Sequence, residues 1–212
     1  MILSDALLAI KYVLLPEAAF GYQSIELASE LPFEGINVYR NNYALPLAYN
    51  VSTTMENVEF SNNPYENQNA LINAMLGRST EIYQDVLVKY EGFDDSEEIW
   101  SITTLTDGPL YLYIDSGKIH SDLYADNCEV YVNGQFLQKT CSRFVINSMH
   151  LGDYKANENI EIRIRHNNKN RDKHSIYIKQ LEQNIFKDVF QQLRSGYICD
   201  LNFNGNTISG IM

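Results

Sequence analysis

The sequence predicts a β-rich α+β fold, in which a jelly-roll-like antiparallel β-sandwich follows a small α/β lobe. Of its 212 residues, 45% are hydrophobic and 20% are charged, so the chain can bury a sizeable core. Fifteen Tyr, nine Phe and 22 Asn favour strands and turns over a helical bundle. The hydrophobic period also changes to two near residue 82. We therefore expect the lobe over residues 1–80 and the sandwich over residues 81–212, with one compact unit as the alternative.

The predicted lobe combines short strands with one well-marked helix. This helix opens at Pro64, because Asn63 can cap its first turn and Glu66 stands at the capping-box position. Apolar residues then recur at helical spacing until Gly77, which is a natural stop. The other elements expected here are a helical start near Ser4 and strands over residues 11–15, 35–40 and 45–51.

The rest of the chain predicts the sandwich strands and one late helix. Asn133 and Gly134, between two apolar runs, give the strongest hairpin signal in the sequence. Isoleucines at 160, 162 and 164 alternate with charged residues, as expected of a strand with one buried face. An amphipathic helix is expected over residues 182–194. The remaining expected strands cover residues 84–90, 99–105, 109–115, 176–178, 198–203 and 207–212.

The charge balance and the chain ends restrict the possible class of protein. Sixteen basic and 27 acidic residues give a formal net charge of −11, which argues against a general nucleic-acid binder. No apolar run is long enough to span a bilayer, and the N-terminus lacks the basic region and cleavage site of a signal peptide. Both ends interrupt hydrophobic segments, which we interpret as cuts through a longer protein.

No motif predicts a catalytic residue, a metal ion or a cofactor. The chain lacks the G-x-S-x-G, H-E-x-x-H, P-loop and dinucleotide-binding patterns. The acidic run over residues 94–98 is interpreted as a solvated turn rather than a cation site, since it lacks the alternating ligands of an EF-hand. The four histidines lack metal-ligand spacing and are interpreted as surface or loop residues. They are His120, His150, His166 and His174.

The three cysteines, Cys128, Cys141 and Cys199, are interpreted as ordinary thiols rather than as parts of a disulfide framework. A bridge between Cys128 and Cys141 is the alternative. These two residues lie diagonally across the predicted hairpin, so a bridge would need a bulge or frayed strand ends.

Two segments could bind a ligand. The start of the predicted helix gathers a carboxylate, amides and an aromatic ring, which could hydrogen-bond sugar hydroxyls, although capping explains part of this cluster without any ligand. Its residues are Tyr65, Glu66, Asn67, Gln68 and Asn69. The second segment could contact phosphates of lipid headgroups or of an anionic polymer, and an exposed hairpin loop is the favoured alternative. Its residues are Arg163, Arg165, Lys169, Arg171 and Lys173.

Three segments resemble the YfhO family, which comprises large membrane proteins of Gram-positive bacteria. The segments are residues 7–14 (LLAIKYVL), 38–49 (VYRNNYALPLAY) and 63–71 (NPYENQNAL). Their order and spacing agree with the family, and the resemblance is closer over residues 7–76 than over residues 77–212. Arg40 stands where an acidic residue is usual, and Tyr65 replaces Phe.

This resemblance implies a soluble extracytoplasmic region of a polytopic membrane protein. The family is thought to act as accessory glycosyltransferases that take sugar from an undecaprenyl-phosphate carrier and decorate teichoic acid outside the cell. Their catalytic carboxylate lies in an early loop between membrane helices, and no position here matches that motif. The resemblance therefore implies a non-catalytic domain, without a cofactor, that positions a glycan or polymer acceptor. The alternatives are a purely structural or protein-interaction sandwich and a carbohydrate-binding, lectin-like module.

Overall fold

The structure is a computed structural model of the chain. It describes residues 2–15, 21–24, 37–94, 97–115, 128–139, 148–166, 175–195, 200–203 and 206–209. The chain divides into two compact units that are interleaved in sequence. The sandwich unit comprises residues 57–73 and 79–185, and the α/β unit comprises residues 1–56, 74–78 and 186–212. The predicted boundary near residue 80 lies next to Ser79, where the longer segment of the sandwich unit begins. Most of the helix predicted over residues 182–194 belongs to the α/β unit rather than to the sandwich. The division into a lobe over residues 1–80 and a sandwich over residues 81–212 stays a prediction, as does its alternative, one compact unit.

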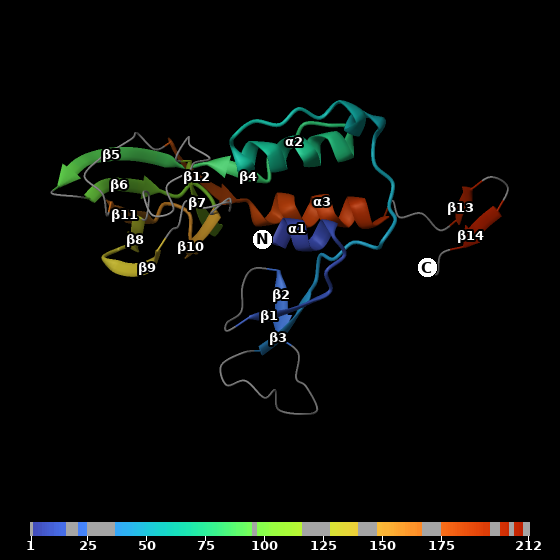
Figure 1. The fold of residues 1–212 in the computed structure, drawn as a ribbon, viewed down its shortest axis with the longest axis horizontal. Coiled ribbons are helices and arrows are strands. Elements are labelled where there is room, and N and C mark those ends of the chain that lie inside the picture. Colours follow the sequence, from blue (N-terminus) through green and yellow to red (C-terminus); the bar gives the residue numbers. More distant parts are fainter. Residues whose placement is uncertain are drawn as a thin grey trace, which may run out of the picture. The chain divides into compact units, whose positions relative to one another are not determined.

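The sandwich unit contains two antiparallel sheets (Figure 1). The four-stranded sheet has the order β10-β7-β12-β4 and consists of β4 (Tyr83–Asp85), β7 (Gly108–Asp115), β10 (Ser148–Tyr154) and β12 (Ser175–Leu181). The five-stranded sheet has the order β5-β6-β11-β8-β9 and consists of β5 (Leu87–Asp94), β6 (Glu97–Thr103), β8 (Cys128–Val132), β9 (Gln135–Lys139) and β11 (Asn159–His166).

The strand order confirms the predicted jelly-roll-like sandwich. From β6 to β12 the chain passes between the two sheets at each connection except the β8–β9 hairpin, so strands distant in sequence become neighbours. A jelly roll consists of two four-stranded sheets connected in this way, and the sandwich strands other than β5 form such a pair of sheets. Strand β5 is an addition that extends one sheet beyond β6. Strands β4 and β5 replace the single strand predicted over residues 84–90, and β10 was not predicted.

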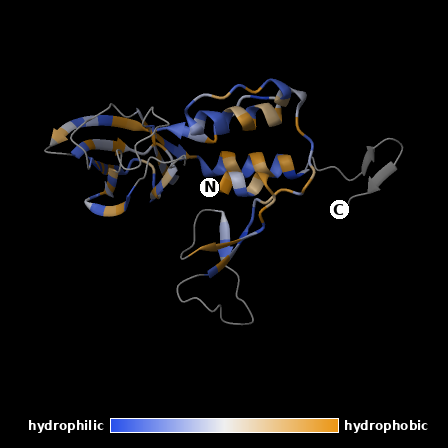
Figure 2. Ribbon diagram, in the orientation of Figure 1, coloured by the Kyte–Doolittle hydropathy of each residue, from blue (hydrophilic) through white to orange (hydrophobic). Residues whose placement is uncertain are grey.

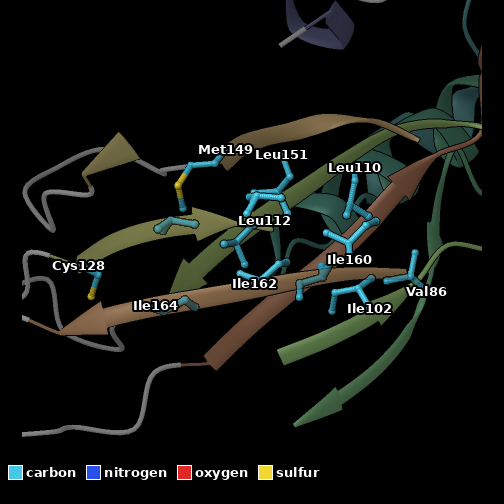
Figure 3. Packing of buried hydrophobic residues seen from close by; sticks show 13 residues of the cluster. Val86, Ile102, Leu110, Leu112, Cys128, Met149, Leu151, Ile160, Ile162 and Ile164 are labelled. Atoms are coloured by element: carbon cyan, nitrogen blue, oxygen red, sulfur yellow. The ribbon is translucent and has the colours of Figure 1, made fainter. Parts of the chain in front are cut away.

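The core of the sandwich lies between the two sheets, as Figure 3 shows. Leu110 and Leu112 of β7 face Ile160 and Ile162 of β11, and Ile162 is fully buried. Because side chains alternate along a strand, the residues between them point outward. Figure 2 accordingly shows hydrophobic and hydrophilic residues interspersed along the sandwich strands. The hydrophobic pattern thus determines which side chains can form a site on the outer faces.

The β8–β9 hairpin forms as predicted. Asn133 and Gly134 have φ values of 50° and 77°, the positive values that a type I′ turn requires at both central residues. The register shifts between Val130 and Tyr131, so the hairpin also contains an irregularity. Cys141 and Cys199 lie outside the described residues, and the pairing of Cys128 with Cys141 stays a prediction.

The α/β unit contains helix α1 (Ile2–Leu7), a sheet of order β1-β3-β2, a 3₁₀ helix, most of helix α3 (Gln183–Ser195) and a β-hairpin. The sheet strands are β1 (Tyr12–Leu15), β2 (Tyr22–Ser24) and β3 (Asn37–Asn41), the 3₁₀ helix is η1 (Thr53–Asn57), and the hairpin strands are β13 (Asp200–Phe203) and β14 (Asn206–Ser209). Tyr43 packs on Phe186 and Phe190 of α3, with ring centroids 5.0 and 6.0 Å apart. Strand β2 was not predicted.

The predicted strand over residues 45–51 is wrong. The backbone N–H of Leu45 donates to the carbonyl of Ala6 in α1, at 2.9 Å, rather than to a neighbouring strand. Pro46 has no N–H to donate, and Leu47 is 95% exposed, so the apolar pattern here does not mark a buried strand. Asn41 instead anchors this segment, since its side chain donates to the carbonyl of Ile10 and accepts from the N–H of Tyr43.

Candidate functional site

Aromatic and polar side chains gather on the outer face of the four-stranded sheet. Three strands contribute one row, in which Tyr113 of β7 stands between Ser148 of β10 and Tyr177 of β12. The next row places Tyr111 between His150 and Lys179. We call this group the aromatic face and define it as Tyr65, Tyr111, Tyr113, Ser148, His150 and Tyr177.

The most accessible aromatic pair of this face is Tyr113 and Tyr177. Their rings stack with centroids 5.9 Å apart and planes 18° apart, and both side chains are partly exposed. Partial burial raises the pKa of Tyr113, and the neighbouring Asp115 and Tyr177 raise it further. The hydroxyl therefore stays protonated at neutral pH and can donate a hydrogen bond beside an exposed ring.

The buried part of the aromatic face is held by helix α2 (Pro64–Leu76), whose residues up to Asn73 belong to the sandwich unit. Tyr65 is fully buried, its ring lies 5.2 Å from that of Tyr83, and its hydroxyl lies 2.8 Å from the hydroxyl of Ser148. The ring of Tyr111 lies 5.8 Å from Tyr83 and 5.4 Å from His150. Burial raises the pKa of both Tyr65 and Tyr111. This packing fixes the sheet surface beneath the exposed pair.

The start of α2 confirms Asn63 as the helix cap. The side-chain oxygen of Asn63 accepts hydrogen bonds from the N–H groups of Tyr65 and Glu66, at 3.0 and 3.4 Å. The predicted capping box is modified, because Ser61 intervenes. Its hydroxyl accepts from the N–H of Asn63 at 3.0 Å and donates to the Glu66 carboxylate at 3.2 Å.

The amides predicted as possible sugar ligands all contact backbone groups. Asn67 makes two hydrogen bonds with Ser61, Asn69 makes two with Tyr83, and Gln68 donates to the carbonyl of Pro64. These contacts give the cluster a structural role. Any sugar contact through Tyr65, Glu66 and these amides stays a prediction.

The predicted basic segment is only partly described, because Lys169, Arg171 and Lys173 lie outside the described residues. Arg163 and Arg165 point outward from β11 on the five-stranded sheet. Both are paired with carboxylates, which are Glu97, Glu129 and Glu161. Arg165 also lies over the ring of Tyr131, 4.9 Å from its centroid, and donates to its hydroxyl at 2.9 Å. A phosphate would have to compete with these ion pairs, so its binding here stays a prediction.

The interpretation of the histidines as surface or loop residues is wrong for His166. It ends strand β11, and its side chain is only 8% exposed. His150 is exposed on β10, as expected, whereas His120 and His174 lie outside the described residues. Among the residues that the structure describes, no group of three His, Cys, Asp or Glu side chains is placed to hold a metal ion.

Most residues of the aromatic face were not predicted from the sequence as a site. The alternation of Tyr111 and Tyr113 with Leu110 and Leu112 could have shown that one face of this strand is aromatic. The contribution of Tyr177 depends on the pairing of β12 with β7, which has no local signal in the sequence.

A protein-family model matches the whole chain. A family model described as "Bacterial membrane protein YfhO" covers residues 1–212. No curated protein matches the chain. Within the described part of the chain, none of the helices has the length and apolar character needed to cross a membrane.

Proposed function

We propose, from the premise that this chain belongs to the YfhO family of bacterial membrane proteins, that it is a non-catalytic domain that positions a glycan or a glycan-bearing polymer. The domain would present this acceptor to the membrane-embedded part of its parent protein, on the extracytoplasmic side. The resemblance to accessory glycosyltransferases makes teichoic acid of a Gram-positive cell envelope the acceptor that we propose.

The observation that carries this proposal is the stacked, partly exposed pair of Tyr113 and Tyr177. Sugar rings have apolar C–H faces that pack on aromatic rings and hydroxyl groups that hydrogen-bond to polar side chains. The aromatic face offers both, because Ser148, His150 and the tyrosine hydroxyls lie beside the exposed rings. Such a surface suits a polymer, since its exposed rings lie on the outer face of a sheet.

Protein contact is a second candidate function, favoured by a different observation. Strand β5 forms an edge of the five-stranded sheet and carries three exposed apolar side chains, Leu87, Val88 and Tyr90. Exposed apolar groups on an edge strand are typical of surfaces that contact another protein. This role would leave the aromatic face unused.

The experiment that tests the proposed function measures the sugar content of teichoic acid in cells that carry the full-length protein. We expect the double variant Tyr113→Ala, Tyr177→Ala to lower this content while the protein remains at normal abundance in the membrane. Tyr12→Ala, which removes an exposed tyrosine of β1 in the α/β unit, is the matched control and should leave it unchanged. An unchanged sugar content in the double variant would refute the proposed use of this face.

A further inference from the structure

Cys128, His166 and Glu98 form a hydrogen-bonded line at one end of the sandwich. Cys128 begins β8 and stands directly opposite His166, the last residue of β11. The Cys128 sulfur lies 3.4 Å from Nδ1 of His166, and Nε2 of the same ring lies 3.0 Å from the Glu98 carboxylate. Sulfur and carboxylate thus occupy opposite edges of the imidazole. They do not converge on one point, so the cluster is not arranged as a metal site.

The three groups are shielded from water to different degrees. Cys128 is 3% exposed, and the side chains of His166 and Glu98 are 8% and 20% exposed. The indole N–H of Trp100 donates to the second carboxylate oxygen of Glu98 at 3.4 Å, which holds this carboxylate toward the histidine. A thiol hydrogen-bonded to an imidazole, which a carboxylate orients in turn, is the arrangement of an activated nucleophile.

The charge state of the histidine agrees with this arrangement. The hydrogen bond with Cys128 and that with Glu98 raise the pKa of His166 to about 9, although burial opposes the rise. The ring is therefore an imidazolium at neutral pH. An imidazolium beside the sulfur can give its proton to a leaving group.

We propose that Cys128 is the reactive thiol of this chain and that a small hydroperoxide converts it to a sulfenic acid, with His166 as the proton donor and Glu98 as the positioning residue. The Cys128 sulfur attacks one peroxide oxygen, and the O–O bond breaks as the S–O bond forms. Sulfur loses two electrons and the peroxide gains them. The leaving alkoxide or hydroxide takes a proton from His166 and becomes an alcohol or water, and His166 takes up the proton that the sulfur gives up. The shielding of Cys128 restricts the site to small reagents.

The test uses the whole chain, reduced beforehand so that all three cysteines are thiols, and hydrogen peroxide as the probe. After timed exposure, the reaction is quenched in denaturant with a reagent that traps sulfenic acid, and each cysteine is quantified by peptide mass spectrometry. We expect Cys128 to be oxidised at least about tenfold faster than Cys141 and Cys199, which serve as internal comparators. Oxidation of Cys128 at the same rate as the other two cysteines, or more slowly, overturns the proposal. This comparison is made within the parent chain and needs no variant.

Two variants test whether His166 and Glu98 activate Cys128, or whether Cys128 is oxidised faster only because peroxide reaches it more easily. His166→Gln should bring the rate at Cys128 down to that of the comparators, and Glu98→Gln should lower it about threefold or more, because the uncharged amide orients the ring less well. Glu97→Gln is the matched control, since Glu97 points to the opposite face and pairs with Arg165, and it should keep the parent rate. Urea unfolding of each variant checks that the fold persists. Parent-like rates in folded His166→Gln and Glu98→Gln would overturn the proposal.

Discussion

The side-chain amide of Asn69 on α2 forms two hydrogen bonds with the backbone of Tyr83 on β4. The Asn69 oxygen accepts from the N–H of Tyr83 at 3.0 Å, and its nitrogen donates to the carbonyl of the same residue at 2.8 Å. Strand β4 lies at the edge of the four-stranded sheet, so this amide takes the place of a further strand. It fixes the helix on the sheet face that carries the exposed tyrosines.

Replacing Asn69 by Ala should lower the free energy of unfolding by about 1–3 kcal/mol, because it leaves two backbone groups of Tyr83 without this partner. Urea unfolding of the chain measures the change. Asn67→Ala is the matched control, since Asn67 makes a similar pair of bonds with the exposed Ser61, where water can replace it. Equal unfolding midpoints for Asn69→Ala and the parent would contradict the structural role of this amide.

The cap at Asn63 should also be measurable. Asn63→Ala removes the acceptor for two helix N–H groups and should cost roughly 0.5–2 kcal/mol of stability. Asn63→Asp keeps an acceptor at the same place and should cost less. The denaturant midpoint decides between them, and an unchanged midpoint with an unchanged m-value in Asn63→Ala would argue against the cap.

The stability of the chain should depend on the ionisation of His166. Its pKa in the folded chain, about 9, exceeds its ordinary value of 6.5, so folding favours the protonated ring. This contribution is complete below about pH 6.5 and is lost as the pH rises through 9. We expect the urea midpoint to fall between pH 7 and pH 10, and to fall less in His166→Gln. His150→Gln, which changes an exposed histidine, should keep the parent's dependence of the urea midpoint on pH. The same pH dependence in all three proteins would refute the assignment of this effect to His166.

The chain alone should transfer no sugar from a lipid-linked donor, because the resemblance assigns catalysis to a part of the family that no residue here matches. Incubation of the chain with a radiolabelled undecaprenyl-phosphate sugar and teichoic acid measures this. The full-length protein in membranes is the positive control. Labelled polymer formed by the chain itself would show that it is an enzyme in its own right.

Local signals predicted some elements of this fold well. Asn63, Pro64 and Gly77 mark the helix α2 through backbone requirements that each residue meets by itself. Asn133 and Gly134 likewise specify a turn whose positive φ values few other residues adopt. The strand predicted over residues 45–51 failed because a hydrogen bond from Leu45 to α1 overrides the local pattern.

The sites depend on pairings that join distant parts of the chain. Tyr113 meets Tyr177 only because β7 pairs with β12, and Cys128 meets His166 only because β8 pairs with β11. Neither partner can be chosen from local sequence, since many strands share the same alternation of residues. The motif residues at the start of α2 were visible in the sequence, but their contacts are largely structural.

The proposed function depends most on whether the aromatic face binds a glycan polymer. Isothermal titration of purified wall teichoic acid into the chain is the most direct measurement. We predict saturable binding that Tyr113→Ala and Tyr177→Ala each weaken about three- to tenfold, whereas Tyr12→Ala on β1 leaves it unchanged. Absence of saturable binding, or equal affinity of all four proteins, would refute the proposed function.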